Sequence, residues 1–149
     1  MGDTISVIQN ADDIVALGKN LEVNGSEAIT LGIDNIVSEE SVAIGHGNET
    51  EGPGNVAVGD NNYIGCEDSY TFGRGNNINS GTGNNQSNTK GNHNYVVGEG
   101  NTVSGSYNYV IGKNQTISDD NTYNNNILIG STGTIRNNNS IIIGDFVEP

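Results

Sequence analysis

The residues of this chain that could take part in acid–base or nucleophilic chemistry are few and scattered. There are two histidines, His46 and His93, and one cysteine, Cys66. His46 follows a glycine that ends an apolar phrase, whereas His93 takes the place that Tyr107 has in the next similar phrase. A single cysteine excludes an intramolecular disulfide and has no partner at metal-ligand spacing. We therefore predict that the chain is not an enzyme and has no catalytic, cofactor-binding or metal-binding residues.

Short glycine-rich segments suggest two further kinds of chemistry, and both are excluded by their context. The segments are GHGN at 45–48, GRGN at 73–76 and GEGN at 98–101. A phosphate-binding loop would need a strand before it and a helix after it, and no helical pattern follows. Calcium-binding repeats have a nine-residue register, and here the period is about fourteen. We therefore expect these glycines to have a structural role in the strands and turns that contain them.

Glycine closes a short apolar phrase at nearly regular intervals. These anchor glycines are Gly18, Gly32, Gly45, Gly59, Gly73, Gly98, Gly112, Gly130 and Gly144. Their spacings are 14, 13, 14, 14, 25, 14, 18 and 14 residues. The gap of 25 allows an extra coil if Asn84 takes the place of a glycine. Such a sustained period predicts a stack of similar coils.

Each coil contains a pattern typical of strands. Positions one and three before the anchor are apolar in nearly every coil and share one face of a strand. We predict that these two positions form the core and that the position between them points outward. A residue five after the anchor, such as Val23 or Ile64, predicts a second inward-facing strand. The anchor glycine suits a tight corner.

Asparagine recurs three positions after the anchor. It does so at Asn35, Asn48, Asn62, Asn76 and Asn101. Stacked at one corner, these side chains would form a ladder of amides, as in other stacked β structures. The alternative is that asparagine is simply a favourable turn residue.

These features predict an all-β fold, a parallel β-roll or β-solenoid of about ten coils of about 14 residues each. The whole chain, 1–149, would be one domain: a first coil or cap at 1–17, repeats at 18–144 and a C-terminal cap at 145–149. Neither a signal peptide nor a stretch of membrane-spanning length is apparent. We therefore expect a chain that is not marked for export and does not insert into membranes.

Charge is unevenly distributed along the chain. Residues 1–73 carry 13 Asp and Glu and one Lys, a net charge of −12, whereas residues 74–149 carry five acidic and four basic residues, a net charge of −1. An acidic rod repels phosphate, so nucleic acid is not an expected partner. The acidic half either keeps the protein soluble or collects divalent cations or a basic partner, and the sequence leaves these alternatives open.

Two segments, SVAIGHGNETEGPGNVAVG at 41–59 and NYVVGEGNTVSGSYNYVIG at 94–112, resemble the head repeats of YadA-like trimeric autotransporter adhesins. The resemblance covers 18–144 and is weakest around Asn84 and between Gly112 and Gly130. It implies left-handed parallel β-rolls, three chains side by side, and it indicates fold much more than ligand. Similar rolls are expected in phage fibres.

Two functions follow from this resemblance. The first is a trimeric structural and receptor-binding protein on a virion surface, such as a fibre, a tip or a capsid appendage that mediates attachment. The alternative is the head of a bacterial adhesin, at the cell surface, that binds host matrix or cells. The expected partners are two further copies of the chain and a partner protein or a surface glycan.

The sequence also suggests where these contacts lie. The position two before the anchor is aliphatic in the last four coils, and an outward stripe there would form the trimer interface. Its residues are Val96, Val110, Leu128 and Ile142. The coil after Gly112 is longer and would present a ligand- or partner-binding loop, unless the insertion has no role. The candidate residues of this loop are Asp119, Asp120, Tyr123, Asn124 and Asn125.

Overall fold

The computed structural model describes residues 4–7, 12–79, 92–117 and 123–145 of the 149. The described residues form strands and no helix. They make a parallel β-solenoid of about 8 turns, which confirms the predicted fold class. The trimer stays a prediction, and so does the C-terminal cap, of which 146–149 lie outside the described residues.

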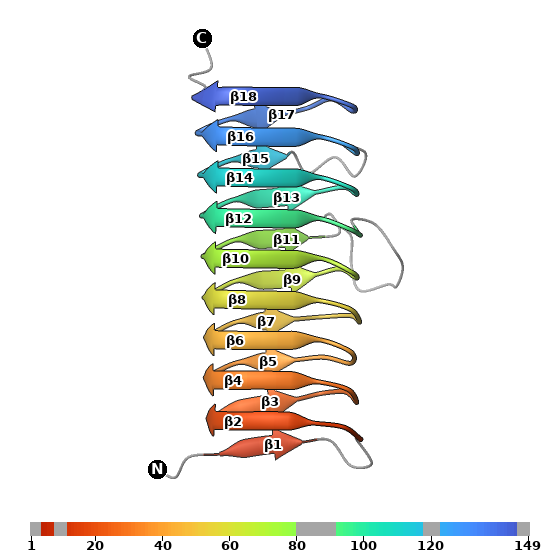
Figure 1. The fold of residues 1–149 in the computed structure, drawn as a ribbon, viewed down its shortest axis with the longest axis vertical. Helices are drawn as coiled ribbons and strands as arrows, with labels where there is room; N and C mark the ends of the chain where they lie inside the picture. Colours follow the sequence, from red (N-terminus) through yellow and green to blue (C-terminus); the bar gives the residue numbers. More distant parts are fainter. Residues whose placement is uncertain (1–3, 8–11, 80–91, 118–122, 146–149) are drawn as a thin grey trace.

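Two nine-stranded parallel sheets face each other along the rod (Figure 1). The short sheet is made of odd-numbered strands: β1 (Ile5–Val7), β3 (Leu21–Val23), β5 (Ile36–Val37), β7 (Glu49–Thr50), β9 (Tyr63–Gly65), β11 (Asn77–Asn79), β13 (Thr102–Ser104), β15 (Thr116–Ile117) and β17 (Thr134–Ile135). The long sheet is made of five-residue, even-numbered strands: β2 (Val15–Lys19), β4 (Ile29–Ile33), β6 (Val42–His46), β8 (Val56–Asp60), β10 (Tyr70–Arg74), β12 (Tyr95–Glu99), β14 (Tyr109–Lys113), β16 (Ile127–Ser131) and β18 (Ile141–Asp145).

Equivalent residues of successive coils are aligned in straight rows. Each anchor glycine pairs with the next one, for example Gly45 with Gly59 and Gly59 with Gly73. We name each row by its position relative to the anchor, so that row −2 lies two residues before it. A property shared by one position of the repeat therefore becomes a continuous line along the molecule.

The anchor glycines lie inside the long-sheet strands and not at the corner where we predicted them. Gly59 has a φ of 127°, and a Cβ added there would overlap the carbonyl oxygen of Gly73. Glycine is therefore required because the backbones of adjacent coils approach closely and because this φ is closed to other residues. The two corners are instead turned by left-handed residues in rows +2 and −5, such as Asn61 and Asp68.

The core lies between the two sheets, and its composition differs in part from the prediction. Row +5 is buried as expected in the coils from Val23 to Ile135, while Thr89 lies outside the described residues. Rows −1 and −3, however, point outward, and row −2 points inward. Side chains alternate along a strand, so row −2 must share a face with row −4, which holds buried Ser and Asn from Ser41 to Asn126. The prediction selected the more hydrophobic face and was wrong.

Two ladders of buried polar side chains run along the core. The predicted ladder in row +3 is confirmed: Asn62 Nδ2 donates to Asn48 Oδ1 at 3.0 Å, and Asn76 Nδ2 donates to Asn62 Oδ1 at 2.9 Å. Row −4 forms a second ladder that the sequence analysis missed. Each of its side-chain oxygens accepts from the next backbone N–H, as in Ser69 N to Asn55 Oδ1 at 3.0 Å. These bonds satisfy polar groups that would otherwise be buried without partners.

The predicted extra coil around Asn84 is not formed in either sheet. Strand β10 pairs directly with β12, so that Gly73 lies beside Gly98, and β11 pairs directly with β13. Segment 80–91 itself lies outside the described residues. This direct pairing removes one of the ten coils that the sequence suggested, and the structure has about 8 turns.

Candidate functional site

The outer face of the long sheet is apolar from one end to the other. Rows −3 and −1 of all nine strands hold only Val, Leu, Ile, Phe or Tyr: Val15, Leu17, Ile29, Leu31, Val42, Ile44, Val56, Val58, Tyr70, Phe72, Tyr95, Val97, Tyr109, Ile111, Ile127, Ile129, Ile141 and Ile143. None of these side chains is buried. Leu17 is 72% exposed, Ile111 49% and Ile143 70%. We call these two rows the apolar face.

The opposite side of the rod is different. The outward row +4 of the short sheet holds Glu22, Ile36, Glu49, Tyr63, Asn77, Thr102, Thr116 and Thr134. Acidic, amide and hydroxyl side chains predominate there, and Tyr63 directs its hydroxyl to Glu51 at 2.9 Å. The protein is therefore two-sided, with one outer face that is mainly polar and one that is apolar.

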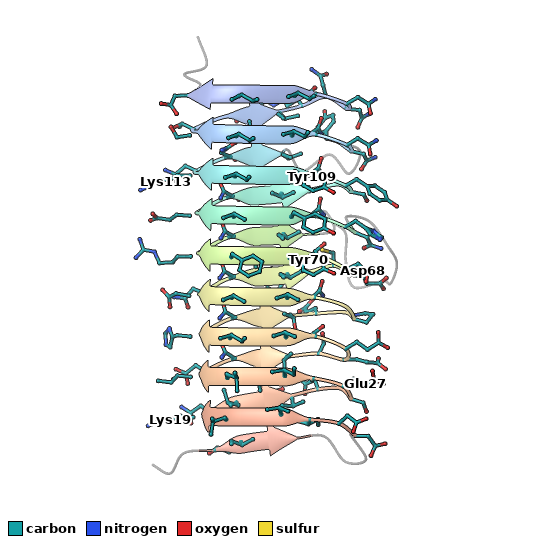
Figure 2. All side chains as sticks on the ribbon, in the orientation of Figure 1. Lys19, Glu27, Asp68, Tyr70, Tyr109 and Lys113 are labelled. Carbon is teal, nitrogen blue, oxygen red and sulfur yellow. The ribbon has the colours of Figure 1, made fainter. Side chains whose placement is uncertain are left out.

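A charged row borders the apolar face. Row +1 continues the long-sheet strands on the same outer side and alternates in sign through Asp60, Arg74, Glu99 and Lys113. Arg74 donates to Glu99 at 2.6 Å, and this hydrogen bond lowers the pKa of Glu99. Lys113 Nζ lies 3.4 Å from the same carboxylate. Figure 2 shows this row at the ends of the arrows, between Lys19 and Lys113. Exposed pairs of this kind stabilise little but favour one arrangement of neighbours.

Aromatic side chains gather on the other border. Tyr70, Tyr95 and Tyr109 stack along row −3, with ring centroids 4.9 and 4.8 Å apart. His93 and Tyr107 stack at the adjacent corner, in row −5, at 4.9 Å. The sequence gives these positions, but only the register shows that they stack.

The structure corrects the predicted trimer stripe. Val96, Val110 and Leu128 are at most 1% exposed, and Ile142 is half-buried against the core. They fill the interior of their own chain, because row −2 points inward, and they offer no outward stripe. The exposed rows on either side of them are the ones that a second chain can reach.

The predicted binding loop is only partly described. Asp119 and Asp120 lie outside the described residues. Tyr123 is half-buried and packs against the core, and its carbonyl accepts from Asn108 at 3.0 Å. Asn124 Oδ1 accepts from the backbone of Ser106 at 2.7 Å, and Asn125 Nδ2 donates to Asn139 at 3.3 Å. The described part of the segment therefore joins adjacent coils, and its role in binding stays a prediction.

The clearest contacts of a reactive side chain in the described residues are those of His46 with Asp60 and Asp34. No three His, Cys, Asp or Glu side chains of these residues are placed to hold a metal ion. Cys66 is buried, and this burial raises its pKa to about 11. None of the described segments is a helix long and apolar enough to cross a bilayer.

No protein-family model and no curated protein matches this sequence.

Proposed function

We propose that this protein is a non-enzymatic structural rod that assembles side by side with two identical copies and mediates attachment on a virion surface. The observation that carries this proposal is the apolar face, which extends over all nine strands of the long sheet. Soluble monomers rarely expose continuous apolar patches of such extent. A partner that covers it must be long, straight and itself apolar.

A second copy of the chain meets these requirements. Its apolar face has the same length and the same spacing of rows, so that parallel copies can align coil by coil. Covering one Val, Leu or Ile side chain stabilises by roughly 1.5–3 kcal/mol, and many such side chains are available. Three copies about an axis parallel to the rods would each contribute this one face and leave the polar short sheets outside. The resemblance to trimeric adhesin heads supports this number of copies.

Sedimentation equilibrium tests the assembly. We expect a mass close to three times 15.6 kDa at micromolar concentration. Ile111→Asp places a charge on the apolar face and should give a folded monomer. The control is Thr102→Asp, on the outer side of the short sheet, which should leave the trimer intact. A folded wild-type monomer at these concentrations would contradict the proposal.

Attachment on a virion is supported by the two-sided architecture, which suits an assembled rod, and by the expectation of similar rolls in phage fibres. A trimer with its apolar faces inside presents three polar surfaces outward, and their acidic residues lie mainly in the first half of the chain. The alternative is the head of a bacterial surface adhesin, which the sequence resemblance favours directly. Immunogold electron microscopy with antibodies against the purified protein separates these functions, because labelling falls on virions in one case and on cell envelopes in the other.

A further inference from the structure

Two aromatic stacks end at the same coil. The stack in row −3 runs from Tyr70 through Tyr95 to Tyr109, with interplanar angles of 10° and 4°. The stack in row −5 consists of His93 and Tyr107, at an angle of 13°. Tyr107 and Tyr109 belong to the coil whose anchor is Gly112, and each is the last ring of its stack. One face of each ring is covered by the preceding aromatic side chain.

The other face of each ring meets a shorter side chain. Asn125 follows Tyr107 in row −5, because its backbone N–H donates to the Ser106 carbonyl at 3.1 Å, and Ile127 is paired with Tyr109. Asn125 Nδ2 donates onward to Asn139 at 3.3 Å, which draws the amide away from Tyr107. Tyr107 is 53% exposed and Tyr109 48%. We call these two terminal rings the tyrosine shelf, in which Tyr109 lies at the edge of the apolar face and Tyr107 lies beyond that face.

The shelf lies at a corner of the rod that is rich in neutral polar groups. Exposed amides of Asn125 and Asn139 continue the row beyond Tyr107. The nearest carboxylate in the same row is Asp68, 3.9 Å from His93 and therefore on the far side of that stack. In Figure 2, Asp68 and Tyr109 lie on the edge where connections enter the long sheet. Among the described residues of row −5, a ligand on the shelf would thus meet aromatic faces and amides, while Asp119 and Asp120 lie outside the described residues.

We propose that the tyrosine shelf binds a neutral saccharide. The faces of aromatic rings carry negative charge density and attract the weakly positive C–H groups of a sugar ring. Asparagine amides supply both donors and acceptors for sugar hydroxyls. Aromatic side chains with few rotatable bonds are also common anchors of binding sites. The inference rests on the attachment part of the proposed function, and it places recognition mainly at Tyr107, outside the apolar face, instead of at the half-buried Tyr123.

The test uses the full-length protein on an array of neutral and charged glycans, followed by calorimetry with the neutral oligosaccharide that gives the strongest signal. Tyr107→Ala should weaken binding by at least about tenfold, since an anchor side chain is lost. Tyr107→Phe keeps the ring face and should bind within about threefold of wild type. Tyr63→Ala removes a tyrosine from the short sheet and should bind like wild type. His93→Ala, which removes the ring that supports Tyr107 and also lies outside the apolar face, provides a second variant if Tyr107→Ala does not fold, as judged by circular dichroism.

Several outcomes overturn the inference: no neutral glycan binds at millimolar concentration, charged glycans or peptides bind in place of neutral ones, or a folded Tyr107→Ala variant binds like wild type. Tyr107 lies outside the apolar face, so its substitution should leave the sedimentation mass unchanged. A trimer that binds no neutral glycan therefore overturns the saccharide site alone, whereas a monomer that binds one overturns the assembly alone.

Discussion

Asn62 and Asn48 join two successive coils through their side chains, with Asn62 Nδ2 donating to Asn48 Oδ1 at 3.0 Å in the interior of the roll. The same Nδ2 also donates forward to the carbonyl of Gly73 at 2.9 Å. Asn62 Oδ1 accepts from the backbone and the side chain of Asn76. One buried amide therefore connects three coils.

Removing this amide should destabilise the whole stack. Asn62→Ala leaves the Gly73 carbonyl and donors of Asn76 without this partner, and an unsatisfied buried group costs about 1–3 kcal/mol. We expect the free energy of unfolding, measured by urea denaturation, to fall by at least that amount. Asn77→Ala alters an exposed asparagine of the short sheet and should change it by less than about 0.5 kcal/mol. Equal effects would contradict a special role for the ladder.

The anchor glycines provide a second contrast. Gly59→Ala introduces a Cβ that overlaps the Gly73 carbonyl oxygen, at a φ of 127° that alanine does not tolerate. We expect the free energy of unfolding to fall by about 3 kcal/mol or more. Gly75 also has a positive φ, 62°, but nothing lies within 4 Å of an added Cβ. Gly75→Ala should therefore cost only about 1–2 kcal/mol, for the left-handed backbone alone.

Val110 and Ile111 are neighbours on opposite faces of β14, and their substitutions should have different consequences. Val110→Asp buries a carboxylate in the core, so we expect loss of the β-sheet circular dichroism signal at all protein concentrations. Ile111→Asp should keep this signal and lose only the assembly. If Val110→Asp gave a folded monomer, the orientation of the long-sheet strands described above would be wrong.

Cys66 should be inert in the folded protein. The thiolate is the reactive form, and burial raises the pKa of this thiol to about 11. At pH 8, a disulfide reagent should therefore modify Cys66 only slowly in buffer and rapidly in denaturant. Fast modification of the native protein would show that this part of the core opens readily.

His46 lies between two carboxylates at the charged border. Its Nδ1 is 2.8 Å from Asp60 and its Nε2 is 3.5 Å from Asp34, and the hydrogen bond to Asp60 is the main cause of a raised pKa. A raised pKa means that this pairing stabilises the fold below pH 6.5 and is lost as the pH rises through the pKa of the folded state. A proton NMR titration should place the midpoint for His46 above 6.5, and Asp60→Asn should lower it. An unchanged midpoint in that variant would exclude Asp60 as the cause.

The periodicity of the sequence was sufficient to predict the solenoid architecture. Equal spacing of glycines, as between Gly45 and Gly59, predicts coils, and the alternation before each glycine predicts strands. The amide ladder of row +3 was predictable because asparagine recurs at one position of the repeat. Stacking the coils brings these side chains within hydrogen-bonding distance of each other. These signals depend only on local spacing, which every coil repeats.

The orientation of the long-sheet strands was not predictable from hydrophobicity. In a phrase such as Tyr109-Val110-Ile111, all three side chains are apolar, and a face that meets a partner resembles a face that meets the core. The available signal was the alternation of side chains along the strand. Asn108 and Val110 lie two residues apart and share a face, and Asn108 belongs to a row in which Ser and Asn recur. The stacking of Tyr107 on His93 also depends on register across coils and has no local signal.

The aligned rows have a consequence for how the gene can change. If one coil such as 46–59 is removed or duplicated, residues at equivalent positions still lie beside each other in successive coils. No side chain moves to the wrong face of its strand. In DNA this is a step of fourteen codons, and it alters the length of the rod by about 4.8 Å, the distance between strands. The reach of the protein can thus be lengthened or shortened in small equal steps, while both of its ends and every lateral contact keep their chemistry.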